Sequence, residues 1–143
     1  MKKQLNFMFF ILFIVILAWL LSPSKSTREK LWVLKGISLA QPYKAAVAEY
    51  VSRKQTFPEG NDLEEEKIRV KVSFDRTAVE SILVGEDGPG VISIHYSASR
   101  ANAAPQEIDN AVIYLTPFLS EDRIRWTCTA AEMPKELTPA VCR

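Results

Sequence analysis

The hydrophobic pattern begins with a continuous apolar segment from Phe7 to Leu21, preceded by only two charged side chains, Lys2 and Lys3. As a helix, these 15 residues, or 17 with Leu5 and Asn6, span roughly 23 to 25 Å, slightly less than the roughly 30 Å hydrocarbon core of a bilayer. The segment therefore predicts a membrane anchor over residues 1–21. The expected anchor side chains are Phe7, Phe10, Ile14, Leu17 and Leu21.

The charges around this segment predict its orientation. Lys2 and Lys3 keep the start of the chain in the cytoplasm and place the following domain outside. A cleavable secretory signal is the alternative. It is disfavoured because no small-x-small pair follows the apolar run, and Ser22-Pro23-Ser24 puts a proline inside the only candidate. The expected location is the inner membrane, single-pass, with the C-terminal domain in the periplasm.

A helical period follows the apolar segment. Ser26 and Glu29 have the spacing of a capping box, which favours a helix start at that point. Apolar residues then recur every three or four positions, at Val33, Ile37, Ala40, Tyr43, Val47 and Tyr50. The pattern predicts a helix over about 27–53 with one buried face, bent at Pro42 and ended by Phe57-Pro58-Glu59-Gly60.

The length of this helix raises a question about its environment. If the anchor and the helix are continuous, together they form a rod of nearly 50 residues, about 70 Å long. The roughly 90 residues that follow are too few to bury such a rod. Lipid or other copies of the chain must cover the rest of it.

The remaining sequence predicts strands. Residues 68–74 alternate apolar and charged or polar side chains, and β-rich runs follow at 79–84, 91–96, 111–116 and 124–129. The expected connections are an acidic connector at 61–66, a hairpin loop at 85–90, a loop at 97–107 and a turn at 117–122. Helix first and strands afterwards predict an α+β fold in one globular domain over 22–143. Its antiparallel sheet, at about 68–129, packs one face on the helix.

Composition and cysteine usage agree with an exported domain. The chain is 48% hydrophobic and 24% charged, with 18 basic and 17 acidic side chains, which argues against disorder and against a generally basic nucleic-acid binder. Its two cysteines, Cys128 and Cys142, predict one disulfide that closes a 15-residue loop and stabilises the fold by about 3 kcal/mol. Together with the single His95 they are too few ligands for a metal site.

The sequence offers little catalytic chemistry. His95 lacks a nucleophilic cysteine and is expected to be an ordinary strand residue; Gly85, Gly88 and Gly90 are expected in a turn rather than a phosphate loop. Trp126 is expected to pack on the sheet or the loop. No enzyme activity and no cofactor are predicted.

Two charged groups leave alternatives open. The acidic residues Asp62, Glu64, Glu65 and Glu66 form either a solvated connector or, less favoured, a calcium site. The basic residues Lys67, Arg69 and Lys71 form either the solvated face of a strand, with Arg53 and Lys54 nearby, or a contact to DNA phosphates.

Three stretches resemble a known family. They are Gly36-Ile37-Ser38-Leu39-Ala40 followed by Ala45-Ala46-Val47-Ala48-Glu49-Tyr50; Leu115 to Ser120 running into Ile124-Arg125-Trp126-Thr127-Cys128; and the Cys128–Cys142 segment with Pro134, Pro139 and Arg143. Together they resemble the type IV pilins. The resemblance implies an extended N-terminal helix packed on an antiparallel sheet, helices bundled in a filament core, and a disulfide loop exposed between subunits.

The N-terminus departs from that family. Members carry a basic leader ending in glycine, then a phenylalanine, and a glutamate one turn later; here Asn6-Phe7 is the nearest approach and no acid occurs from Met1 to Leu21. In the register of the family, Met1 falls where the mature chain would begin. The expected function is that of a minor or assembly-modulating pilus subunit that contributes to cell adhesion, with other pilins or assembly proteins as partners. The alternative is a membrane-tethered binding module for DNA or a protein that does not polymerise.

Overall fold

The computed structural model describes residues 11–17, 25–66, 68–102 and 104–143. Residues 11–17 are helical, followed by α2 (Lys25–Leu39), α3 (Gln41–Lys54) and the short α4 (Asp62–Glu65). The strands are β1 (Val79–Val84), β2 (Ile92–Tyr96), β3 (Val112–Ser120) and β4 (Arg123–Ala131). Three short 3₁₀ helices complete the chain: η1 (Ala98–Arg100), η2 (Gln106–Ile108) and η3 (Ala140–Cys142).

The α2–α3 pair occupies the region of the predicted helix. The break falls at Ala40, and Pro42 lies in the first turn of α3, where its missing N–H removes the bond to Ser38. The helix is thus interrupted two residues before Pro42, the position at which a bend is predicted. The helix ends at Lys54, where Gln55 adopts a left-handed conformation (φ 62°) and its N–H donates to Val51 O at 2.8 Å. The capping box at Ser26 adjoins residues outside the described part and stays a prediction.

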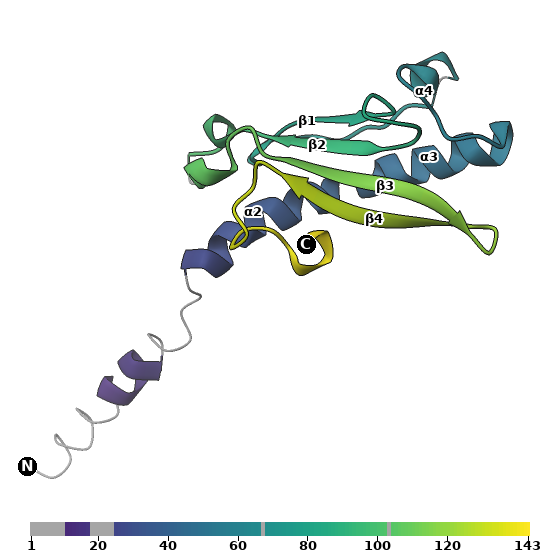
Figure 1. The fold of residues 1–143 in the computed structure, drawn as a ribbon. Helices are drawn as coiled ribbons and strands as arrows, with labels where there is room; N and C mark the ends of the chain where they lie inside the picture. Colours follow the sequence, from purple (N-terminus) through teal and green to yellow (C-terminus); the bar gives the residue numbers. More distant parts are fainter. Residues whose placement is uncertain (1–10, 18–24, 67, 103) are drawn as a thin grey trace, which may run out of the picture.

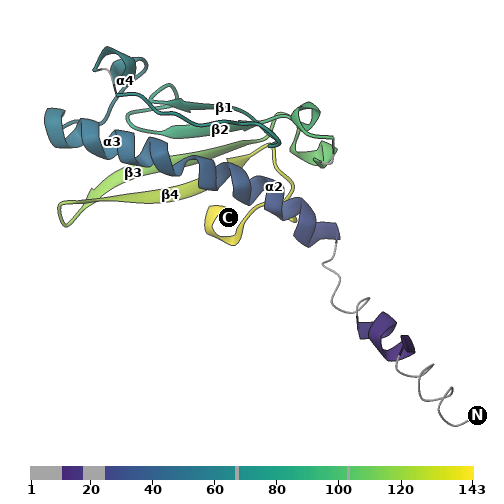
Figure 2. The same ribbon diagram turned by 180° about the vertical axis from the view of Figure 1, so that it is seen from behind.

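The sheet is an antiparallel meander with strand order β1-β2-β3-β4. The α2–α3 helix lies along one face of it, and the other face carries no long helix in the described part of the chain (Figures 1 and 2). The expected α+β architecture of a helix on an antiparallel sheet is confirmed. The core between the two layers is formed mainly by Val33, Ala40 and Val47 from the helices and by Ile92, Ile94, Tyr96, Ile113 and Leu115 from the sheet.

The β3–β4 hairpin is longer than expected. The six-residue turn predicted at 117–122 is wrong: only Glu121 and Asp122 form the turn, and Ser120 pairs with Arg123. Proline is typical of turns, but Pro117 is part of β3, opposite Trp126. Counting from the two-residue turn, it falls on a non-hydrogen-bonded pair, so its missing N–H costs no ladder bond to β4. The pairing of β3 with β2 stops at Leu115.

The strand predicted at 68–74 is also wrong. The alternation itself is present, because Ile68, Val70, Val72 and Phe74 are half-buried and the residues between them are exposed. Nevertheless, no backbone hydrogen bond within the described residues joins this segment to β1. The segment packs against the head mainly through its half-buried side chains, and among the described residues its backbone bonds to other backbone only at its ends, from Ile68 N to Leu63 O and from Thr77 N to Phe74 O. The apolar period therefore correctly predicted which side chains face inward, but it did not predict whether the segment bonds to a neighbouring strand.

Candidate subunit interface

Large aliphatic side chains remain uncovered along the helices. Every residue from Ile11 to Leu17 is exposed, by 45% to 63%. On α2, Leu31 and Leu34 are 58% and 45% exposed, whereas Val33 on the opposite face is fully buried against the sheet. Large apolar side chains that stay exposed on a helix mark a candidate contact site. We call Leu31 and Leu34 the outer stripe of α2.

The predicted anchor is only partly described. Ile14 and Leu17 lie in the helical segment 11–17 with half of their surface exposed, while Phe7, Phe10 and Leu21 lie outside the described residues. None of the helices that the structure describes is both long and apolar enough to cross a membrane. The anchor thus stays a prediction from sequence.

The joint between α2 and the sheet is built around Tyr96. Its hydroxyl donates to the backbone carbonyl of Val33 at 2.7 Å, and both groups are buried. Gly36 makes this approach feasible: a Cβ there would lie 2.7 Å from Tyr96 Cζ. Burial raises the pKa of Tyr96 well above its ordinary value, so the phenol stays protonated as a donor. The helical period indicated Val33 but gave no sign of Tyr96 as its partner.

The C-terminal loop is fastened to β4. The predicted disulfide between Cys128 and Cys142 is confirmed, with Cα atoms 4.4 Å apart. Pro134 O accepts bonds from Leu137 N and Thr138 N at 2.9 and 3.0 Å, and Arg143 Nε donates to Thr138 O at 3.2 Å. Leu137 is buried whereas Val141 is 74% exposed. The loop therefore fills part of the core and presents an apolar side chain to the surroundings.

A second polar joint connects α3 to the segment after it. Asp62 Oδ2 accepts bonds from the Glu59 backbone N–H and from the Tyr50 hydroxyl, each at 2.9 Å. These donors lower the pKa of the Asp62 carboxyl, and the Glu59 backbone N–H is the larger cause. The hydrogen bond between Tyr50 and Asp62 raises the pKa of Tyr50. The predicted acidic connector at 61–66 thus contains the short helix α4, which is bonded to α3 through Tyr50 and Asp62.

The contact to DNA phosphates stays a prediction, and part of the basic group is paired with a carboxylate. Arg69 and Lys71 are exposed on the extended segment, and Lys67 lies outside the described residues. Arg53 and Lys54 bond to Glu66, with N–O distances of 3.7 and 2.6 Å, and this partner raises the pKa of Lys54. Two of the five expected cations are therefore already neutralised by a neighbouring carboxylate.

The other residues singled out in the sequence have structural positions. Gly85, Gly88 and Gly90 lie in the β1–β2 connection with positive φ, as expected of turn residues. Trp126 is half-buried, and Lys44 Nζ lies 5.2 Å from its ring centroid. His95 is on β2 with its Nε2 buried and without a hydrogen-bond partner. Within the described residues no group of three His, Cys, Asp or Glu side chains could hold a metal ion.

Comparison with known proteins relates this architecture to one family. The family model of pilins, the subunits of bacterial filaments, matches residues 33–143. A search of curated proteins found no significant match. Since the match covers most of the chain, including α3, the sheet and the disulfide loop, the protein belongs to the pilin family.

Proposed function

We propose that this protein is a subunit of a type IV pilus, held in the inner membrane by its N-terminal segment before assembly, with its head in the periplasm. The observation that carries the proposal is the outer stripe of α2. Leu31 and Leu34 face away from the head of a chain that belongs to the pilin family. The disulfide supports an oxidising compartment, because such bonds form outside the cytoplasm.

We further propose a minor or assembly-modulating role, with a contribution to cell adhesion. The sequence from Met1 to Leu21 carries no acidic residue. In the type IV pilins that the chain resembles, a glutamate there neutralises the N-terminal amine of a neighbouring subunit inside the apolar core. Without it, an incoming amine stays unpaired in hydrocarbon, at a cost of several kcal/mol. A copy that adds weakly suits a rare position in the filament better than the repeating shaft.

The experiment uses the full chain in its own cell envelope. Surface filaments are sheared off and probed with an antibody to the head, and quantitative mass spectrometry gives its ratio to the most abundant filament protein. We expect the chain in the filament fraction at a small fraction of that protein. Confinement to membranes would instead favour the tethered binding module.

Matched variants link the result to the stripe. Leu31→Ser with Leu34→Ser removes exposed apolar surface from α2 and should lower recovery in filaments at least about tenfold. The control is Ala45→Ser with Ala48→Ser, two exposed positions on α3, which should leave recovery unchanged. Equal recovery of both variants would contradict the role of the stripe.

A further inference from the structure

A cleft of about 610 Å³ lies beside the outer edge of the sheet. One wall is the extended segment with Ile68 and Val70, and the other is the end of β1 with Ile82 and Val84. β1 pairs with β2 alone, and in the described part of the chain no backbone bond crosses from 68–74 to β1. These apolar side chains pack largely into the head itself, beside Ala46, Tyr50 and Leu63, so the lining of the cleft is mixed polar and apolar. The free edge of β1 beside it favours the binding of further polypeptide.

The tip of the β3–β4 hairpin carries exposed apolar side chains. Phe118 and Leu119 are 44% and 59% exposed, and as neighbours on a strand they point to opposite faces of the hairpin. The turn at Glu121 and Asp122 has only two residues, so the tip is narrow. The tip is therefore a narrow ribbon with an exposed apolar side chain on each face.

The charges of the two surfaces match. The cleft presents two acidic side chains, Glu64 and Glu86, and two basic ones, Arg69 and Lys71. The tip offers the opposite set, which consists of Arg123, Arg125, Glu121 and Asp122. None of these eight side chains forms an ion pair with another described residue. Each surface therefore carries unpaired charges of both signs that the other can neutralise.

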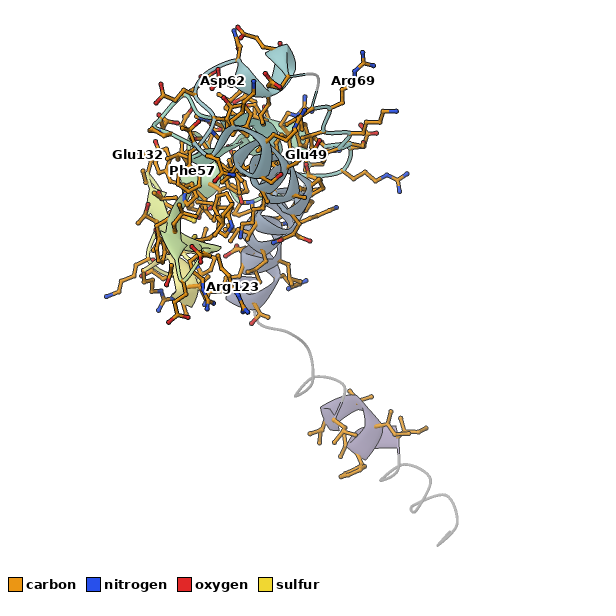
Figure 3. The ribbon with its side chains drawn as sticks, turned by 90° about the vertical axis from the view of Figure 1, so that its right-hand side faces the viewer. Glu49, Phe57, Asp62, Arg69, Arg123 and Glu132 are labelled. Atoms are coloured by element: carbon orange, nitrogen blue, oxygen red, sulfur yellow. A yellow bond between two sulfur atoms is a disulfide. The ribbon has the colours of Figure 1, made fainter. Side chains whose placement is uncertain are left out.

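The positions of the two surfaces determine whether the tip and the cleft of one chain can contact each other. β1 and β4 are the opposite edges of the sheet. Figure 3, which views the head from the right-hand side of Figure 1, shows Arg69 of the cleft near the top and Arg123 of the tip at the bottom. A tip cannot reach the cleft of its own chain, so any contact joins two copies. Such a contact uses two different surfaces and leaves one of each free on every pair, which permits continued addition.

We infer that the β3–β4 tip of one copy docks in the β1-edge cleft of a second copy. This inference rests on the proposed function, since it describes how neighbouring heads contact one another. Two variants of the full chain in detergent micelles test it. The tip variant carries Arg123→Glu and Arg125→Glu, and the cleft variant carries Glu64→Lys and Glu86→Lys.

Self-association is measured by sedimentation at several protein concentrations and low salt. Each variant alone should associate at least about tenfold more weakly than the unmodified chain, because like charges then meet across the contact. An equimolar mixture should recover association, since reversed tips meet reversed cleft acids and unmodified tips meet unmodified clefts. Arg100→Glu with Lys135→Glu, two exposed positions away from both surfaces, controls for net charge and should behave as the unmodified chain.

Separate readouts keep this contact distinct from the helix stripe. Disulfide trapping of Leu34→Cys in membranes reports helix contacts between copies. If that trapping occurs while the tip and cleft variants associate normally, or if the mixture fails to recover association, the docking is overturned and the proposed function stands. If trapping fails, the stripe is not a subunit contact, and the mixture alone decides the docking.

Discussion

The ring of Tyr96 lies directly against the backbone of Gly36, so that the phenol fills the place that a Cβ of α2 would otherwise occupy. Glycine costs a helix interior up to about 1 kcal/mol relative to alanine. The helix bears this cost because the missing Cβ lets the phenol reach the Val33 carbonyl. Two predictions test this contact.

Gly36→Ala should destabilise the head by about 1 to 3 kcal/mol, although alanine is the better helix former. The added Cβ would lie 2.7 and 2.8 Å from two carbons of the buried ring, which has little room to move. Denaturant unfolding of the full chain in detergent measures the change. Ser38→Ala, on the exposed side of the same helix, is the control and should shift stability very little. If Gly36→Ala stabilised the protein instead, the Tyr96 ring would have moved to accommodate the added Cβ, which would contradict the prediction.

Tyr96→Phe should cost about 1 to 2 kcal/mol, because it removes the hydroxyl donor to the buried Val33 carbonyl without changing the size of the ring much. Tyr114→Phe is the matched control, since Tyr114 is half-buried and its hydroxyl has no hydrogen bond in the described part of the chain. The same unfolding experiment compares the two. Equal losses would mean that the Tyr96 bond contributes nothing specific.

The disulfide predicts a measurable loss when it is removed. Cys128→Ala with Cys142→Ala opens a loop of about 15 residues and should destabilise the head by roughly 2 to 4 kcal/mol. Thermal unfolding without reductant measures this, and the unmodified chain with reductant should fall to a similar midpoint. Unchanged melting of the double variant under non-reducing conditions would refute the prediction.

Asp62 predicts a dependence of stability on pH. The pKa of its carboxyl is lowered in the folded state, so the charged carboxylate stabilises the fold at pH values above the ordinary aspartate pKa of about 3.9. That contribution is lost as the pH falls through the lower pKa of the folded state. Asp62→Asn should therefore lower stability at neutral pH and flatten the decline below about pH 4. Melting temperatures from pH 7 to pH 3 test this, with Glu107→Gln as an exposed control. Parallel curves for Asp62→Asn and the unmodified chain would contradict it.

The β3–β4 turn predicts a gain in stability. Glu121 and Asp122 both have positive φ, 50° and 59°, as a type I′ turn requires, although asparagine and glycine suit those angles better. Glu121→Asn with Asp122→Gly should stabilise the head by up to about 1 kcal/mol. Asp122→Val, which fits this backbone poorly, should have the opposite effect. Denaturant midpoints at low protein concentration compare the three proteins.

Much of the fold was predictable because the spacing of apolar residues along a helix or strand indicates which of its faces is buried. Val33, Ala40 and Val47 were expected on the inner face of the helix and are fully buried there. The period at 68–74 was equally clear and still misleading, because alternation shows which side chains face inward but not whether a neighbouring strand lies within bonding distance. The six-residue turn expected at 117–122 failed for a related reason, since Pro117 tolerates a strand position that needs no donor.

The candidate interface was less accessible from the sequence. Leu31 and Leu34 are ordinary apolar residues in a helical run, and only the placement of the sheet shows that nothing in the described head covers them. Gly36 could not be assigned a partner, because Tyr96 lies 60 positions further along the chain. The cysteines were easier, since their small number left a single pairing.

The bond from Tyr96 to the Val33 carbonyl has a mechanical consequence. Part of any tension on the N-terminal end of α2 passes to β2 through this hydrogen bond. β2 is flanked by β1 and β3, so the load is shared in shear by the ladders on its two sides. A pull applied through this bond strains both ladders together, whereas a pull on an outer strand would separate a single ladder bond by bond.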